Sequence, residues 1–312
     1  MQIYYGIDPP LPRLMGSAVT IGNFDGVHCG HRQLLQILRQ TAQTSKLPSV
    51  LITFEPLSKE YFSTLHPDRY DCPVRISPLK DKLSIIADSG LVDIVIVLNF
   101  DANLARMTAE SFVKLVLLTQ LNTRYLILGA DFKFGHDRRG DYHYLSQFSQ
   151  FKTICLPSLF VSGIRVSSSV IRATLLKGDF KQAELFLGHS YSLSGIVKHG
   201  LKLGRKLGCP TANIDLQQRR FPLQGIYVVE VEGKFGQRRG VASFGTNPTI
   251  SDDPSLKFEV HLLDFNDDLY GQTLKITFKA KIRDELKFAN LEQLKKQLTK
   301  DIQAAKTWSA RP

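Results

Sequence analysis

Apolar residues in the first 187 positions occur in short runs separated by longer amphipathic stretches. The runs are rich in Val, Ile and Leu with little polar alternation, which is typical of strands covered on both faces of a parallel sheet. Between the runs, apolar residues recur at helical spacing, as Leu34, Leu35 and Leu38 do. This alternation predicts a doubly wound, Rossmann-like α/β domain. Strands are predicted at 17–22, 49–54, 93–100, 124–129 and 152–156, and helices at 30–44, 79–87, 108–120, 167–177 and 179–187.

After Gly188 the pattern changes to short, often alternating strands separated by Gly, Pro and Asn. Such a pattern predicts a small antiparallel β-barrel. A final helix is predicted at 291–308, where apolar residues again recur at helical spacing. We therefore predict two domains, 1–187 and 188–312, in agreement with a prior of roughly 150 residues per domain. The barrel strands are predicted at 192–197, 226–231, 239–244, 257–265 and 273–282.

The composition is that of an ordinary globular protein, with 43% apolar and 22% charged residues. The four cysteines are widely scattered without a CxxC pair, which excludes a disulfide scaffold and a recognisable cysteine-based zinc site. No apolar run approaches the ~20 residues that a membrane helix needs. The first ten residues, MQIYYGIDPP, have neither the basic nor the apolar region of a secretory signal. We therefore expect a soluble, cytoplasmic protein without a membrane partner.

The chain carries 40 basic and 29 acidic residues, a net charge of +11. The first 187 residues hold 20 basic and 16 acidic residues (+4), and the remainder holds 20 and 13 (+7). Because the excess is spread through both parts, no Lys/Arg block of the kind that forms a nucleic-acid tail is present in the sequence. Phosphate-bearing small molecules explain this charge as well as a nucleic acid would.

The segment 19–35, VTIGNFDGVHCGHRQLL, runs from a predicted strand through a glycine-rich turn into a predicted helix. Backbone N–H groups and the positive end of a helix dipole hold phosphate oxygens. His28 and His31 are three residues apart, so they would lie on one side of the first helical turn and reach the same anion. The alternative is a glycine-rich turn with two surface histidines. The longer string NFDGVHCGH resembles the HxGH signature of nucleotidyltransferases related to class I aminoacyl-tRNA synthetases, which transfer AMP from ATP.

A second segment, LILGADFKFGHDRRGD (126–141), leaves a predicted strand into a glycine-rich, basic turn. It places Asp131 at the carboxyl edge of the predicted sheet. Open α/β sheets bind their ligands at that edge. We therefore expect Asp131 to line the same site as the HxGH turn.

A third segment, RVSSSVIR (165–172), presents three hydroxyls at a predicted helix start. Serines at such a position are usually N-caps. The flanking Arg165 and Arg172 favour a second phosphate clamp, such as one for leaving pyrophosphate. The serines concerned are Ser167, Ser168 and Ser169.

In the second domain, HGLKLGRKLGCPTANI (199–214) has a glycine every four residues with basic residues between them. No GxxxxGK[ST] can be written through it, so it is not a Walker A motif. A basic glycine flap could still cover phosphates, with Thr211 and Asn213 supplying oxygens to Mg²⁺. The alternative is an ordinary basic surface hairpin. In KFEVHLLDF (257–265), strand alternation places Glu259 and His261 on one face, where Glu259 could serve as general base toward a hydroxyl or be merely ion-paired.

Taken in order, NFDGVHCGH, DFKFG, RVSSSVIR, GRKLGCPTANI, GVASFGTNPTI, FEVHLLDF, LYG and KIRDELKF resemble the bifunctional riboflavin kinase/FAD synthetase family of bacteria over nearly the whole chain. The resemblance implies that the barrel domain converts riboflavin and ATP to FMN and ADP. It also implies that the α/β domain converts FMN and ATP to FAD and pyrophosphate. ATP and Mg²⁺ would be required, and the partners would be small molecules rather than nucleic acid.

The same resemblance implies roles for individual residues. His28 and His31 would stabilise the transition state at the α-phosphate, and Glu259 would orient or deprotonate the ribityl hydroxyl. Residues implied to bind ATP or its phosphates in the first domain are Asn23, Asp25, Asp131, Ser167, Ser168, Ser169 and Arg172. Residues implied to bind ATP or flavin in the kinase domain are Gly204, Arg205, Thr211, Asn213 and Arg283, with Thr211 and Asn213 on Mg²⁺.

Two positions depart from the family pattern. Ser169 replaces a usual threonine and keeps its hydroxyl. Leu57 and Ser58 stand where a proline-containing run is usual, so the family pattern does not predict the structure of the loop after the second strand. One alternative function is a different small-molecule adenylyltransferase, which would leave the PTAN and FEVHLLDF segments unexplained. Another is a nucleic-acid-binding protein, such as a tRNA-related module, which predicts strong, salt-dependent RNA affinity.

Overall fold

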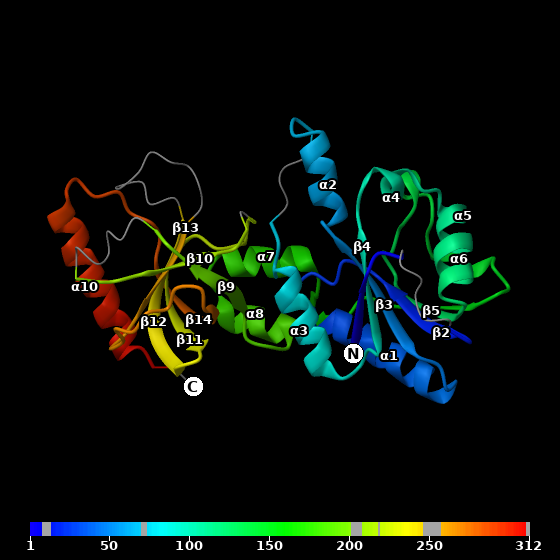
Figure 1. The fold of residues 1–312 in the computed structure, drawn as a ribbon, viewed down its shortest axis with the longest axis horizontal. Coiled ribbons are helices and arrows are strands. Elements are labelled where there is room, and N and C mark those ends of the chain that lie inside the picture. Colours follow the sequence, from blue (N-terminus) through cyan, green and yellow to red (C-terminus); the bar gives the residue numbers. More distant parts are fainter. Residues whose placement is uncertain (8–13, 70–73, 201–207, 218, 246–256, 310–312) are drawn as a thin grey trace. The chain divides into compact units, whose positions relative to one another are not determined.

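The computed structural model describes residues 1–7, 14–69, 74–200, 208–217, 219–245 and 257–309 (Figure 1). The chain forms two compact units. Residues 1–73 and 82–167 make the first, and residues 74–81 and 168–312 make the second. These units are defined by contacts within the structure. The predicted domains, 1–187 and 188–312, are defined by the activity that each carries, and that division stays a prediction. Among the described residues, no helix is long and apolar enough to cross a membrane.

The first unit is built on a six-stranded parallel sheet, which confirms the predicted α/β class. The edge strand β1 was not predicted, because its four residues, QIYY, are too short and too exposed to give a clear pattern. The strand order reverses between β2 and β5. After β2 the chain adds β3 and β4 on one side of it, and β5 and β6 are then added on the other side. In order across the sheet, the strands are β1 (Gln2–Tyr5), β4 (Ile94–Asn99), β3 (Ser49–Glu55), β2 (Ser17–Ile21), β5 (Thr123–Gly129) and β6 (Lys152–Leu156).

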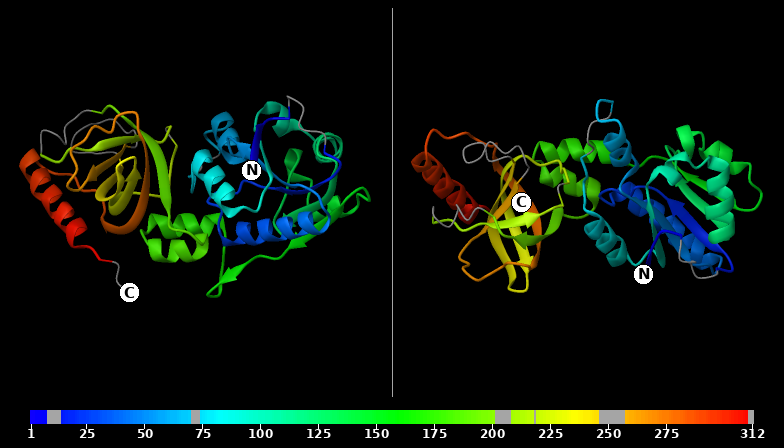
Figure 2. Two further views of the ribbon diagram at one scale, coloured as in Figure 1. Left: turned by 60° about the horizontal axis from the view of Figure 1, so that its bottom comes forward. Right: turned by 45° about the horizontal axis from the view of Figure 1, so that its top comes forward.

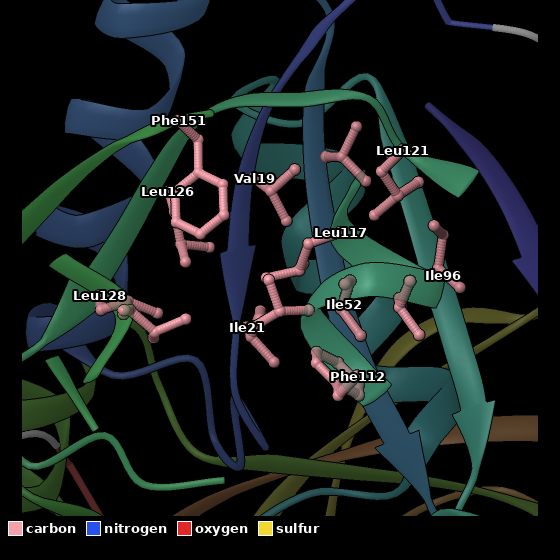
Figure 3. Packing of buried hydrophobic residues seen from close by; sticks show 14 of the residues in the cluster. Val19, Ile21, Ile52, Ile96, Phe112, Leu117, Leu121, Leu126, Leu128 and Phe151 are labelled. Atoms are coloured by element: carbon pink, nitrogen blue, oxygen red, sulfur yellow. The ribbon is translucent and has the colours of Figure 1, made fainter. Parts of the chain in front are cut away.

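Both faces of this sheet are buried, as the uninterrupted apolar runs predicted. On one face, Val19, Ile52, Ile96 and Leu126 point toward the helical segment that carries Leu117 (Figure 3). Alternate residues of the same strands lie on the opposite face, where helix α1 (Cys29–Thr44) packs against β2, β3 and β5 (Figure 2). Helices thus cover both faces of the sheet, and the candidate site lies at the carboxyl ends of its strands.

The predicted helices are present with small differences in their ends. α3 covers Leu79–Ser89, and α7 (Ser168–Leu176) and α8 (Phe180–Leu187) follow the sheet. The segment predicted as one helix at 108–120 begins at the predicted N-cap, Thr108, as α5 (Ala109–Phe112), and then widens into the π-helix η1 (Val113–Gln120). Elements that the pattern did not predict are α2 (Ser58–Leu65), α4 (Ala102–Arg106), η2 (His136–Arg138), α6 (Tyr142–Ser146), β7 (Phe160–Val161) and β8 (Ile164–Arg165).

The second unit contains a closed antiparallel barrel of six strands, which confirms the predicted class. The sixth strand, β10, lies within the PTANI motif and is too short to show a pattern of its own. β13 ends three residues earlier than predicted, since Asp264 has left-handed backbone with φ 53°. Around the barrel, the strands are β10 (Ala212–Asp215), β13 (Lys257–Leu262), β12 (Gly236–Gly245), β11 (Gly225–Gly233), β14 (Thr273–Arg283) and β9 (Ser192–Lys198).

The C-terminal helix α10 (Leu291–Thr307) covers part of the barrel's outer surface (Figures 1 and 2). Its Ala305 and Ile302 pack against Ile226 and Val228 of β11 and Val241 of β12. The apolar spacing along the helix predicted such a face. Its partner could only be identified from the structure.

Phe180 of α8 belongs to the aromatic core of the barrel unit. Its ring is 5.6 Å from those of Phe278 and Tyr227, and the side chain is 5% exposed. Replacing such a ring by alanine typically costs ~3–5 kcal/mol. We expect Phe180→Ala to lower the unfolding free energy of the barrel unit by about this amount in a denaturant titration. Leu185→Ala, an exposed position on the same helix, should change it by less than ~0.5 kcal/mol, and equal effects would contradict this packing.

Candidate functional site

The turn between β2 and α1 lies at the carboxyl edge of the sheet, beside the point where the strand order reverses. Parallel α/β sheets bind ligands there. Asn23 is exposed on this turn, whereas Asp25 and His28 are buried. Asp131 follows β5, the neighbouring strand, by two residues. The fold therefore brings Asn23, Asp25, His28 and Asp131 to one sheet edge, as the sequence predicted.

His28 is the N-cap of α1. Its Nδ1 accepts a hydrogen bond from the backbone N–H of His31 at 3.3 Å. The two imidazole rings are stacked, with centroids 3.6 Å apart and planes 13° from parallel. A Cβ added at Gly30 would lie 3.3 Å from the His28 ring, so glycine gives this ring its space. The pair thus forms one surface at the helix N-terminus, where an anion is stabilised.

The surroundings of the His31 ring favour its neutral form. Burial lowers the pKa of His31 well below its usual value, and electrostatic interactions with His28 and Lys82 lower the pKa further. Among the described residues, His31 Nδ1 is a buried ring nitrogen without a hydrogen-bond partner. A neutral imidazole has one donor and one acceptor nitrogen, so it can donate a hydrogen bond to a phosphate oxygen from one side only.

A buried lysine that the sequence pattern did not indicate lies beneath this turn. Lys82 of α3 is 2% exposed, and its Nζ donates to the backbone oxygen of Asn23 at 3.1 Å. It also donates to Thr53 Oγ1 at 2.8 Å. A lysine inside an amphipathic helix is usually solvated, and only the full burial of Lys82 sets it apart.

Asp131 is paired with Arg165. The Arg165 guanidinium contacts the Asp131 carboxylate, and Arg165 ends the short hairpin of β7 and β8. Both side chains remain substantially exposed. The sequence motifs DFKFG and RVSSSVIR thus meet through one ion pair at the sheet edge.

The predicted phosphate clamp divides between the two units. Ser167 is the last residue of the first unit, whereas the other members lie in α7 of the second. There the Arg172 Nε donates to the backbone oxygen of Val74 at 2.6 Å, which ties α7 to the segment 74–81. The members in α7 are Ser168, Ser169 and Arg172. Their proposed contact with outer phosphates stays a prediction.

A group of half-buried aromatic rings follows β3 and β4. Phe54 is the last residue but one of β3, Phe100 follows β4, and Tyr61 and Phe62 lie on α2. Phe100 is 5.8 Å from Phe54, 5.6 Å from Tyr61 and 5.9 Å from Phe62, measured between ring centroids. Phe54, Tyr61 and Phe62 belong to the segment 54–62, whose structure the sequence did not predict, whereas Phe100 lies outside it. Their density in FEPLSKEYF was the available signal.

In the second unit, the residues predicted for phosphoryl transfer lie on adjacent strands. Asn213 of β10 is the direct cross-strand partner of Glu259 of β13. The Thr211 hydroxyl donates to Glu259 Oε2 at 3.3 Å. Burial raises the pKa of Glu259, although the Thr211 hydrogen bond and the Lys257 charge partly oppose the rise. A hydroxyl, an amide oxygen and a carboxylate thus gather on one face of the sheet.

Neighbouring residues fix this group in place. His261, which shares the face of Glu259, has Nδ1 2.8 Å from the backbone oxygen of Pro210, next to Thr211. A Cβ at Gly200 would lie 2.3 Å from the Asn213 amide nitrogen. Glycine is therefore required at 200 for the Asn213 side chain to keep its position. Sequence alternation predicted the shared face but not the contact between His261 and Pro210.

A pocket of about 460 Å³ adjoins Thr211 in the barrel unit. This volume falls within the range for small-molecule sites, roughly 300–1,000 Å³. Beside it, the rings of His199 and Tyr270 lie 3.9 Å apart. The pocket is lined by Val197, Pro210, Thr211, Ala212, Val260, Leu262 and the loop Phe265, Asn266, Asp267, Asp268, Leu269 and Tyr270. The sequence indicated this loop only through the LYG motif.

Arg283 has a structural partner. Its Nε and Nη2 atoms donate to the carboxylate of Asp301 on α10, with the closest contact at 2.7 Å. Asp301 is 1% exposed, so the ion pair anchors α10 to β14. The predicted contact of Arg283 with flavin or nucleotide stays a prediction. Gly204 and Arg205 lie outside the described residues.

Comparison with known proteins assigns both units. Residues 12–170 match the family model described as FAD synthetase, and residues 187–309 match the one described as riboflavin kinase. A bifunctional riboflavin kinase/FMN adenylyltransferase from Haemophilus influenzae is 40% identical over 312 residues, covering 99% of each chain. The protein of that name from Pseudomonas fluorescens is 39% identical, covering 99% of this chain and 98% of its own.

A solved structure described as a macrolide-efflux protein from Streptococcus pneumoniae has the same fold. It matches with a TM-score of 0.81 and 30% identity, over 99% of this chain and all of that one. Its description differs from those of the curated relatives, and both family models agree with the relatives. The chain therefore belongs to the bifunctional riboflavin kinase/FMN adenylyltransferase family.

Proposed function

We propose that this chain makes FAD in two steps, phosphorylating riboflavin in the barrel unit and adenylylating the resulting FMN at the parallel sheet. In residue terms, the proposed division is 1–187 for adenylylation and 188–312 for phosphorylation. The main support is that each unit builds its own cluster of side chains suited to phosphate chemistry. The partners are small molecules, and the proposed location is the cytoplasm.

In the phosphorylation step, the terminal ribityl hydroxyl of riboflavin attacks the γ-phosphorus of ATP and ADP leaves. Glu259 accepts the hydroxyl proton, and its raised pKa makes it a better base than an exposed carboxylate. The pocket that Thr211 lines is the proposed position of the nucleotide.

Mg²⁺ fits the oxygen donors on this face, because it prefers one or two protein oxygens together with waters and substrate phosphates. Thr211 and Asn213 are the residues proposed to hold it, next to the Glu259 carboxylate. When bound, the ion neutralises charge on the transferring phosphate. The protein's own contribution is then to position the hydroxyl.

In the adenylylation step, a phosphate oxygen of FMN attacks the α-phosphorus of ATP and pyrophosphate leaves. His28 and His31 would donate hydrogen bonds to oxygens on which charge develops, assisted by the N-terminus of α1. Asn23, Asp25 and Asp131 lie at the same sheet edge. Ser167, Ser168, Ser169 and Arg172 are proposed to contact the outer phosphates.

The aromatic rings around Phe100 are the proposed platform for the isoalloxazine ring of FMN. They lie after β3 and β4, on the same carboxyl edge as the HxGH turn. Planar aromatic ligands pack favourably against such rings.

The full chain with riboflavin, ATP and Mg²⁺ is expected to yield FMN and then FAD, resolved by chromatography. With FMN, ATP and Mg²⁺ but no riboflavin, it should release one pyrophosphate for each FAD. Chelation of Mg²⁺ by EDTA should stop FMN formation, and added Mg²⁺ should restore it. Absence of both products under these conditions would contradict the proposal, whereas salt-sensitive RNA binding in their place would favour the nucleic-acid alternative.

A further inference from the structure

The buried ammonium group of Lys82 connects three elements of the first unit. It donates to Thr53 Oγ1 of β3 at 2.8 Å and to the Asn23 oxygen at 3.1 Å. The Thr53 hydroxyl donates to the same Asn23 oxygen at 3.2 Å. Thr53 is fully buried, and Lys82 is 2% exposed. Burying a cation costs free energy unless it is well hydrogen-bonded. A lysine that served only solubility would lie at the surface, so the burial of Lys82 indicates another role.

The oxygen that Lys82 holds belongs to a turn with unusual backbone. Phe24 and Val27 have φ values of 48° and 41°, in the left-handed region that residues other than glycine seldom adopt. Such a conformation persists only where the surrounding structure fixes it. Asn23 directly precedes Phe24, and His28 directly follows Val27. Anchoring the Asn23 oxygen therefore fixes the start of the turn whose end carries His28.

The charge of Lys82 also acts on the histidine pair. Burial is the largest cause of the lowered pKa of His31. Electrostatic interactions with His28 in the same turn and with Lys82 in α3 lower this pKa further. The ammonium group thus contributes a positive potential at the N-terminus of α1, where the helix dipole has the same sign. A polyphosphate is attracted by both.

We propose that Lys82 is a positioning residue for adenylyl transfer, fixing the turn 22–28 from beneath and adding positive charge behind the phosphate-binding end of α1. The proposal rests on the function proposed for the HxGH turn. Lys82 acts through Asn23 and the histidines, so it need not contact the substrate.

Lys82→Met removes the charge and the hydrogen bonds while keeping a similar length. We expect kcat for FMN adenylylation to fall by roughly 10²-fold, as for a small displacement of catalytic groups. Lys82→Arg, which keeps the charge, should recover part of that loss. Thr53→Val removes the hydroxyl but keeps the cation. Lys80→Met, an exposed position on the same helix, is the matched control and should leave the rate unchanged.

A second measurement separates positioning with charge from a purely structural role. The His31 ring is titrated by NMR in histidine-labelled full-length protein. Its pKa should rise in Lys82→Met and stay near wild type in Lys82→Arg and Thr53→Val. Riboflavin phosphorylation, assayed on the same samples, reports that the second unit is intact, and a cooperative melt reports folding of the first. Lys82→Gln replaces Lys82→Met if the latter does not fold.

Adenylylation by Lys82→Met or Lys82→Gln within a few-fold of wild type would overturn the proposal. So would an unchanged His31 titration accompanied by equal losses in Lys82→Met and Thr53→Val. Failure of the underlying function is distinguishable: in that case His28→Ala with His31→Ala would also leave adenylylation intact.

Discussion

Replacing Glu259 by glutamine is expected to lower riboflavin phosphorylation by ~10²–10⁴-fold, the usual contribution of a positioned general base. Glutamine keeps the size and one acceptor oxygen for the Thr211 hydroxyl, but it lacks the negative charge and the basicity. ATP binding should change little, and FAD formation from supplied FMN should be unaffected, because that reaction belongs to the other unit. Separate assays of the two reactions on this one variant provide the measurement.

The pH dependence of the same reaction gives an independent check. Burial raises the pKa of Glu259, so the carboxylate takes up its proton at a higher pH than an exposed glutamate would. Phosphorylation should therefore decline as the pH falls through this raised pKa, while the wild-type protein remains folded. The acid limb should be absent from the residual activity of Glu259→Gln.

Glu232 supplies the matched control for this experiment. It is an exposed glutamate on β11 of the same barrel, and Glu232→Gln removes the same charge. Surface ion pairs are worth only ~0–1 kcal/mol, so this variant should phosphorylate riboflavin normally. If Glu259→Gln also did so, Glu259 would be no more than a partner for nearby charge.

Replacing both His28 and His31 by alanine is expected to abolish FAD formation while leaving FMN formation near normal. Each well-placed donor to developing charge typically contributes ~10²–10³ in kcat. Because these hydrogen bonds strengthen in the transition state, kcat should fall more than the KM for ATP rises. Steady-state adenylylation with supplied FMN measures both quantities.

The effect of His28 on helix stability, as the N-cap of α1, must be distinguished from its effect on adenylyl transfer. Loss of an N-cap costs about 1 kcal/mol of stability, which thermal melting of the variant detects. Asparagine is a good N-cap, so His28→Asn should recover the melting temperature without recovering FAD formation. His143→Ala, an exposed histidine on α6, should alter neither. Near wild-type FAD formation by the double variant would show that the turn has another role.

Much of the fold was readable from local pattern. The apolar runs of β2 to β5 lie inside a sheet covered on both faces, so most of their residues are apolar and buried. The barrel strands alternate because one face is core and the other is not. Where the pattern failed, the elements were short or lay at an edge, as β1 and β10 do. Pairing with a neighbour, rather than their own residues, makes those segments strands.

The HxGH turn was recognisable because its glycines and histidines are close together in the chain. Thr211 and Glu259 are 48 positions apart, and only the family resemblance joined them in one predicted site. The side-chain contacts between distant segments were not predictable. Arg165 meets Asp131, and Arg283 meets Asp301, only because hairpin and helix return to the strands. An arginine in a motif does not reveal whether its partner is a phosphate or a carboxylate of the same chain.

The sequence by itself determined the two fold classes, the order of the elements and the family, since these follow from hydrophobic period and from motifs that are local in the chain. The tertiary structure decided what surrounds each functional residue. Lys82 is the clearest case, because 59 positions separate it from Asn23. A solvent-exposed lysine in a helix would look the same in the sequence. In the folded chain α3 places Lys82 against Thr53 of β3 and the Asn23 oxygen, and this burial makes an ordinary lysine a fixed charge beneath the site.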